Sequence, residues 1–147
     1  MSTALTSVER AAIAWECERL IHLYAMLNDA GDFAAMAAMF TEDGVFARPS
    51  QGELLIRGRA AILAAYTSRP PRFTRHLITS VVVTVDDHDN ARAHSYLSLH
   101  TGQPGEDLPR PAEPAFLIGD FKDRFVRQDG VWKFSERLGS LALKVGG

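Results

Sequence analysis

A single histidine stands at the head of the strongest strand signal in the chain, where an imidazole can act as a base. Residues 73–85 are rich in β-branched side chains, follow Pro70-Pro71 and stop at a turn-forming run, 86–90. Side chains alternate along a strand, so His76 shares one side with Ile78, Ser80, Val82 and Thr84. The other side, with Leu77, Thr79, Val81, Val83 and Val85, is the better core face. His76 therefore either points to solvent or enters a second, more polar cavity.

The chemistry that this histidine offers is proton abstraction. An imidazole with an ordinary pKa near ~6.5 accepts a proton at neutral pH, and a carboxylate on its other nitrogen fixes the tautomer and stabilises the imidazolium. The proton would come from a carbon next to a carbonyl or a leaving group. The alternative, a strand-end histidine hydrogen-bonded to a loop, remains open.

A second unusual position is Asp29, in the last turn of a predicted helix. A carboxylate there faces the negative end of the helix dipole, which costs roughly 0.3–1 kcal/mol at an exposed site. Local rule-breaking of this kind is typical of functional positions. The other reading is plain turn chemistry, because residues 28–32 read Asn-Asp-Ala-Gly-Asp between two helices.

Three helices are expected before the strand of His76. Residues 6–9 have the spacing of a capping box, and the helix that follows should end near Gly31. Its apolar positions recur every three or four residues at Ile13, Cys17, Leu20, Tyr24 and Leu27. Asp32 can cap a short second helix, and a third covers residues 60–66. Short strands are expected at 45–48 and 53–56.

The second half of the chain predicts a run of antiparallel strands. Residues 91–101 place Arg92, His94, Tyr96, Ser98 and His100 on one face and Ala93, Ser95, Leu97 and Leu99 on the other. A proline-rich loop at 104–114 precedes strands at 115–127 and 131–138, which an Asp-Gly turn joins. Residues 139–147 receive no assignment. The layout is α+β, one domain over residues 1–147, with helices on one face of a curved sheet.

Composition narrows the classes of partner and location. The net charge of −2, from 16 basic and 18 acidic residues without long runs, argues against nucleic acid and anionic membrane as partners. No signal peptide or membrane span is visible, so a cytoplasmic protein is expected. The single cysteine, Cys17, excludes an internal disulfide and reads as a small buried hydrophobe.

Metal and nucleophile chemistry find little support. At ~3.3 Å per residue, His94 and His100 are about 20 Å apart along one strand, too far to bind one ion. His22 stands alone on its helix, and His88 belongs to an acidic turn. No serine lies in a Gly-x-Ser-x-Gly elbow. We therefore expect no metal and no cofactor.

Several short motifs, in order, resemble one family. They are Tyr24-Ala25 with Asp29 and Asp32-Phe33, then 39–45, 58–62, 75–79, 121–125 and 129–134. Together they are similar to the SnoaL-like branch of the nuclear-transport-factor-2-like superfamily, over roughly residues 8–138. The resemblance implies a cone-shaped fold in which a curved sheet wraps three helices around a deep, largely apolar pocket. Members have many activities, so the fold does not name a reaction.

The site residues implied by the resemblance come from two members, scytalone dehydratase and hexachlorocyclohexane dehydrochlorinase. Both pair an aspartate at the end of the first helix with a histidine at the head of the central strand, which here are Asp29 and His76. The dehydratase's second histidine corresponds to His100. Its two substrate-orienting tyrosines are replaced by Asn28 and Arg48 and its pocket asparagine by Phe121, so its substrate contacts do not carry over.

The resulting hypothesis is a small-molecule enzyme of dehydratase or isomerase type. His76 would be the base, Asp29 its orienting acid and His100 the acid or donor to the substrate. The expected substrate-binding residues are Tyr24, Asn28, Arg48, Tyr66, Tyr96, Ser98 and Phe121. The substrate would be a small apolar or aromatic molecule, and the family implies a homodimer. The alternatives are a non-catalytic ligand-binding or dioxygenase-β-subunit-like protein, or a polyketide cyclase.

Overall fold

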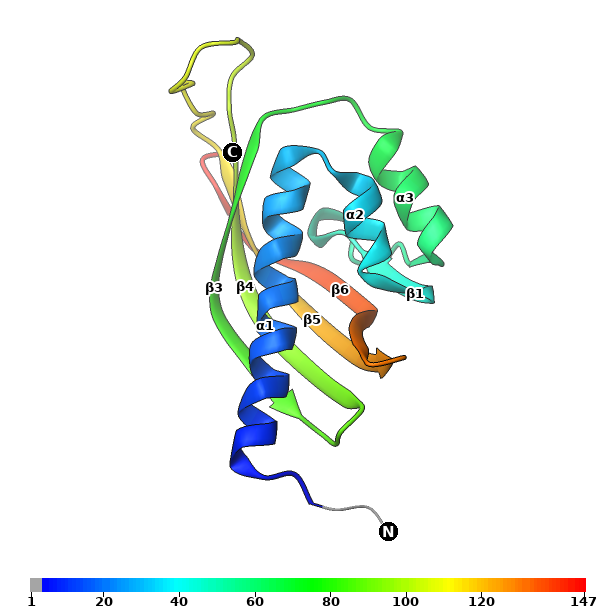
Figure 1. Ribbon diagram of the computed structural model, residues 1–147. Coiled ribbons are helices and arrows are strands. Elements are labelled where there is room, and N and C mark those ends of the chain that lie inside the picture. Colours follow the sequence, from blue (N-terminus) through cyan, green and yellow to red (C-terminus); the bar gives the residue numbers. More distant parts are fainter. Residues whose placement is uncertain (1–3) are drawn as a thin grey trace.

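The computed structural model describes residues 4–147 as three helices on a six-stranded sheet (Figure 1). The helices are α1 (Ser7–Ala30), α2 (Phe33–Ala38) and α3 (Arg59–Thr67), with a short 3₁₀ turn, η1 (Pro49–Gln51). The strands are β1 (Phe40–Ala47), β2 (Ile56–Arg57), β3 (Thr74–Val85), β4 (Asn90–Thr101), β5 (Phe116–Gln128) and β6 (Val131–Val145). The α+β prediction is confirmed, and the residues left without assignment complete β6.

The sheet has the order β2-β1-β6-β5-β4-β3 and is mixed. All neighbours pair antiparallel except β1 and β6, which run parallel, whereas the sequence predicts only antiparallel strands. A parallel pair requires a long crossover, and here the whole segment from β2 to β5 separates the two strands. The predicted Asp-Gly turn does join β5 to β6 as an antiparallel hairpin.

Helix α1 begins and ends where its local signals predict. Thr6 and Glu9 form both hydrogen bonds of the capping box, and Gly31 ends the helix with a φ of 75°. A residue with a side chain would be strained in that left-handed conformation. The last turn of α1 therefore ends at a defined residue. Asn28 and Asp29, in this turn, lie beside the first residues of β3.

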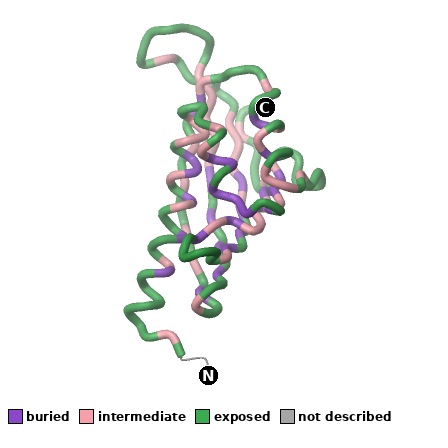
Figure 2. The backbone as a smooth tube through the Cα atoms, turned by 45° about the vertical axis from the view of Figure 1, so that its right-hand side comes forward, coloured by how far each residue is buried: buried purple, intermediate pink, exposed green. Residues whose placement is uncertain are grey.

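The core lies between the helices and the concave face of the sheet, where the buried positions gather (Figure 2). Tyr24 of α1 packs in edge-to-face contact with Phe40 of β1 and Phe134 of β6. Cys17 is fully buried in this cluster, and burial raises the pKa of its thiol to about 12. The thiol therefore stays protonated at neutral pH and serves as core packing.

A bulge in β3 changes which side chains face the helices. Ser80 has a φ of 54°, and the pairing of β3 with β4 shifts between Thr79 and Val82. The extra residue reverses the alternation. Before the bulge Leu77 is 53% exposed and His76 turns inward, and after it Val82 is 63% exposed. The predicted core face is correct only beyond Ser80, and His76 stands on the concave side.

No helix within residues 4–147 is both long and apolar enough to cross a membrane.

Candidate functional site

A cavity opens between the last turns of α1 and α3, the segment that joins α3 to β3, the end of β1 with η1, and the concave face of the sheet. Its volume is about 70 Å³, several times the ~10–15 Å³ that one water occupies on the same measure. The apolar part of its wall comes mainly from Phe46, Ile78, Leu97, Leu99 and Phe121. Its polar part comes from Tyr24, Asn28, Tyr66 and His76, and from the guanidinium groups of Arg48, Arg69, Arg72 and Arg137.

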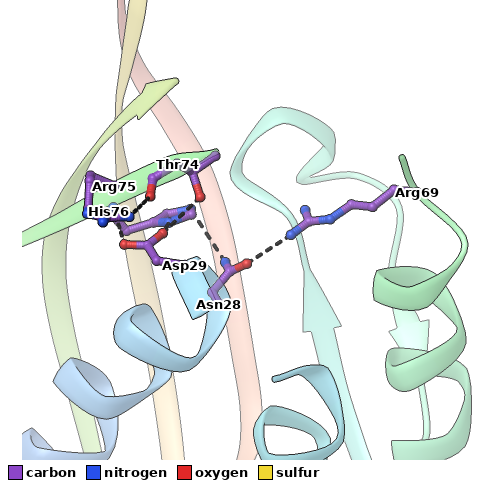
Figure 3. A network of polar contacts seen from close by, with 6 residues as sticks. All are labelled: Asn28, Asp29, Arg69, Thr74, Arg75 and His76. Atoms are coloured by element: carbon purple, nitrogen blue, oxygen red, sulfur yellow. Dashed lines mark hydrogen bonds and ion pairs between the residues drawn. The ribbon is translucent and has the colours of Figure 1, made fainter. Parts of the chain in front are cut away.

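His76 and Asp29 form a close pair at one side of the cavity. The Asp29 Oδ1 atom lies 2.6 Å from Nδ1 of His76, and only 10% and 12% of the two side chains is exposed. The backbone N–H of His76 donates to Oδ2 at 2.9 Å, and Thr74 Oγ1 donates to Oδ1 at 2.9 Å. A carboxylate only accepts hydrogen bonds, so the hydrogen of the imidazole stays on Nδ1. Nε2, on the other side of the ring, is turned toward Asn28 (Figure 3), and His76 lines the cavity.

Two opposing effects set the pKa of Asp29. Burial, the largest single effect, raises it, but the hydrogen bonds from His76 and Thr74 and the coulombic attraction that His76 exerts when it is protonated outweigh burial and hold the pKa below its usual value. The carboxyl therefore remains ionised at any pH near neutrality. It can fix the imidazole and stabilise the positive charge that forms when Nε2 takes a proton.

This lowered pKa predicts a pH dependence of stability. A carboxyl with a depressed folded-state pKa stabilises the fold above its unfolded-state pKa, and this contribution is lost as the pH falls through the folded-state pKa. We expect the free energy of unfolding of the wild type to fall more steeply below pH ~4 than that of Asp29→Asn. Urea unfolding at several acidic pH values measures the two slopes, and equal slopes would contradict the assignment.

The Thr74 hydroxyl gives a second, milder prediction. Thr74→Val keeps the shape but removes one donor from an ionised carboxylate, which should cost about 1.5–3 kcal/mol of unfolding free energy. Thr79→Val, at an exposed position of the same strand, is the control and should change stability by about 0.5 kcal/mol or less. Urea unfolding of both variants decides; equal effects would mean that the bond to Asp29 carries no special weight.

Asn28 links the histidine to an arginine. Arg69 Nη2 donates to Asn28 Oδ1 at 2.8 Å, which turns the amide nitrogen toward His76 Nε2 at 3.4 Å. Figure 3 shows Asn28 between these two side chains. The amide hydrogen is thus placed beside the atom that would accept a proton, where it can also donate to a bound molecule.

Two buried tyrosines share a hydrogen bond on the cavity wall. The hydroxyls of Tyr24 and Tyr66 are 2.6 Å apart, and both side chains are at most 3% exposed. Burial raises the pKa of both groups, so both remain protonated. One bond between two hydroxyls uses one hydrogen, and the other hydrogen is available to a ligand.

A buried ion pair lies at the base of the cavity. Arg137 Nη1 is 3.1 Å from Asp123 Oδ2, and neither side chain is more than 1% exposed. The guanidinium also stacks 3.9 Å from the ring centre of Phe121. Sequence analysis missed this pair. Its signal was Asp123 between Phe121 and Phe125 at core-facing spacing in β5.

The structure corrects the placement of three predicted site residues. His100, Ser98 and Tyr96 are on the outer face of the sheet and do not line the cavity. His100 pairs across the strands with Arg75, while the partner of His76 is Leu99. The ring of His100 stacks on Phe116 with centres 4.6 Å apart. The two faces of β4 were predicted correctly. In β3, however, the side that carries His76 faces the helices before the bulge, and the other side faces them after it.

The other predicted residues do converge. Tyr24, Asn28, Arg48, Tyr66 and Phe121 line the same cavity as His76, with Asp29 directly behind it. Thr74, Arg69 and Arg72 were not predicted. The last two lie in the irregular segment after α3, where arginines normally read as solvated. Within residues 4–147 no three His, Cys, Asp or Glu side chains gather as a metal site would need.

Solved structures share this architecture. A candidate scytalone dehydratase from Novosphingobium aromaticivorans is similar at 21% identity over 97% of this chain and 92% of its own, with a TM-score of 0.81. A hexachlorocyclohexane dehydrochlorinase, LinA type 2, is similar at 16% identity over 95% and 92%, with a TM-score of 0.79. A nuclear-transport-factor-2-like protein with a cystatin-like fold, also from Novosphingobium aromaticivorans, is similar at 25% identity over 86% of this chain and 79% of its own, with a TM-score of 0.70.

Sequence comparison gives the family directly. No curated protein matches the chain. The SnoaL-like domain pattern matches residues 9–138, which is most of the sequence and includes every residue of the cavity except Leu141. The curved sheet, the three helices and the matched range agree with one another. The chain therefore belongs to the family of SnoaL-like domains.

Proposed function

We propose that the protein is a cofactor-independent enzyme of dehydratase or isomerase type, in which His76 removes a proton from a carbon of a small molecule. The observation that carries the proposal is the 2.6 Å contact between His76 and Asp29 beside the cavity. With Nδ1 turned to Asp29, Nε2 is the nitrogen of His76 that can accept a proton from a bound molecule, beside the Asn28 amide.

The proton transfer follows from this arrangement. The Nε2 lone pair takes the proton from a carbon next to a carbonyl or leaving group, and the positive charge that develops on the ring is stabilised by the ionised Asp29. The two electrons of the broken C–H bond form a new double bond. In an isomerisation the proton returns to another carbon, and in an elimination a leaving group departs.

The tyrosine pair supplies the acid that an elimination needs. The free hydrogen of Tyr24 or Tyr66 can protonate a departing oxygen or bond to a developing oxyanion. Asn28 offers a second donor beside Nε2. Because His100 does not line the cavity, we assign the donor role to the tyrosine pair instead.

The names of two structural relatives support elimination chemistry. A dehydratase removes water and a dehydrochlorinase removes hydrogen chloride, and both reactions combine loss of a proton with loss of a leaving group. Their identity to this chain is low, so this support concerns the reaction class and not the substrate.

A ligand screen followed by isotope exchange tests the proposal. Phenolic, ketonic and halogenated ring compounds are screened by thermal shift, and each ligand is then incubated with the protein in D₂O and followed by NMR. We expect a subset of ligands to gain deuterium or lose a leaving group with the wild type but not with Asp29→Asn. Ligands that bind both proteins and remain unchanged would favour a binding protein.

A second proposal concerns the outer sheet face, which carries Leu77, Val82, Tyr96 and Leu143, each at least 46% exposed. Such apolar exposure favours a protein partner there, and we propose a homodimer. Native mass spectrometry distinguishes the outcomes: a dimer of this chain supports the proposal, a co-purifying different chain supports the subunit-type alternative, and a monomer contradicts both.

A further inference from the structure

The cavity wall carries an excess of positive charge. Arg48, Arg69, Arg72 and Arg137 line it, and among residues 4–147 no aspartate or glutamate does. Arg137 is neutralised by Asp123 beneath it. Asp29 borders the same surface depression as Arg69 and Arg72, but it already accepts three hydrogen bonds from His76 and Thr74. Across residues 4–147, no carboxylate lies within ion-pair distance of Arg48, Arg69 or Arg72.

The donors of these arginines are mostly unused. Arg48 donates to the Ala65 carbonyl and, at 3.5 Å, to Gln51 Oε1. Arg69 donates to Asn28, and its guanidinium lies 4.7 Å from the ring centre of Tyr66. Arg72 is exposed and has no hydrogen bond to any residue that the structure describes. Burial, followed by the like charge of Arg72, lowers the pKa of Arg69. An anion between the two side chains would relieve this repulsion.

The opposite side of the cavity is apolar. Ile78, Leu97 and Leu99 present aliphatic side chains from β3 and β4, and Phe121 adds an aromatic ring. A molecule that fits both sides has an apolar body and one anionic end. The planar guanidinium fork of arginine matches a carboxylate in geometry and charge.

We propose that the substrate is an apolar carboxylic acid whose carboxylate binds Arg69 and Arg72 at the cavity mouth, with its hydrocarbon part against Ile78, Leu97 and Leu99. That the acid is a substrate rests on the proposed function. Its binding to the two arginines does not require catalysis. Asn28 bonds to both Arg69 and His76, so a carboxylate held by Arg69 sits one side chain away from Nε2. The bound acid is thus oriented with its adjacent carbons toward the base.

A matched pair of probes tests this inference by isothermal titration calorimetry. 1-Naphthoate carries the carboxylate, and 1-naphthamide has the same shape without charge. Charge-assisted hydrogen bonds contribute about 1.5–3 kcal/mol, so we expect naphthoate to bind the wild type at least about tenfold more tightly. The preference should shrink at high salt because Arg72 is exposed to solvent.

Two variants test whether the preference for naphthoate arises from the arginines at the cavity mouth. Arg72→Gln removes an exposed guanidinium that forms no hydrogen bond or ion pair with any described residue, so the fold should persist, and most of the preference for naphthoate should disappear. Arg75→Gln makes the same charge change on the outer face of β3 and should keep it. Equal affinity for the two probes, no binding of naphthoate, or an unchanged preference in Arg72→Gln would each overturn the inference.

The same titrations on His76→Ala separate this inference from the proposed function. If the inference is correct, His76→Ala retains the preference for naphthoate, whether or not the protein is an enzyme. Loss of the preference only in His76→Ala would show that the histidine, and not the arginines, selects the anion. Turnover, measured independently, reports on the function alone.

Discussion

Replacement of His76 by alanine should reduce turnover about 10²- to 10⁴-fold, which is the range that one positioned acid–base group contributes. The variant removes the imidazole that the described residues contribute to the cavity wall and leaves the arginines and tyrosines in place. KM should change far less than kcat, because the base acts mainly in the transition state. Steady-state kinetics on a ligand from the exchange screen, in parallel with the wild type, gives both values.

The chain provides its own control for this experiment. His94 lies 2.6 Å from Asp120 on the outer face of the sheet, so a second histidine–aspartate pair exists outside the cavity. We expect His94→Ala to retain wild-type turnover. A His76→Ala protein that turns over at the wild-type rate would overturn the mechanism, and equal losses in both variants would point to a general structural effect.

The second large effect concerns stability. Arg137→Met should lower the free energy of unfolding by about 3–5 kcal/mol, because it leaves the buried Asp123 without its counter-charge. Burial raises the pKa of Asp123 to about 6 while Arg137 works against that rise. Without Arg137 the folded-state pKa rises further, so the variant should become less stable as the pH increases above the unfolded-state value near ~3.9.

A double variant distinguishes the ion pair from simple packing loss. Arg137→Met combined with Asp123→Leu removes both charges, so it should be markedly more stable than Arg137→Met alone at neutral pH. Chemical unfolding of the wild type, the single and the double variant completes the comparison. If the double variant were less stable than Arg137→Met, the destabilisation by Arg137→Met would come from lost packing against the rings around Arg137 and not from the unpaired charge of Asp123.

Local signals in the sequence predicted local structure well. The capping box at Thr6 and Glu9, the end at Gly31 and the Asp-Gly turn depend on residues close in sequence, and each occurs as expected. The pairing of β1 with β6 joins segments about ninety residues apart, for which no local pattern exists. The bulge at Ser80 similarly depends on how β3 meets β4, and it decided the direction of His76.

The candidate site followed the same division. Asp29 and His76 were predicted through the family resemblance, and the fold brings them within hydrogen-bond distance. Arg69 and Arg72 were missed because an arginine beside prolines usually faces water, and only the folded chain shows that both border a cavity. Asp123 was within reach of sequence analysis, since an acid at a core-facing strand position needs a partner.

The proposed mechanism requires that His76 hold a hydrogen on Nδ1 toward Asp29 and turn the lone pair of Nε2 toward the bound molecule. Nitrogen-15 NMR of the histidine rings in mildly alkaline buffer tests it directly, with the His76 signals assigned by their absence in His76→Gln. We expect the wild-type His76 ring to carry its hydrogen on Nδ1 and none on Nε2, and we expect Asp29→Asn to weaken this preference. A His76 ring with its single hydrogen on Nε2, or with hydrogens on both nitrogens, would contradict the role of His76 as the base.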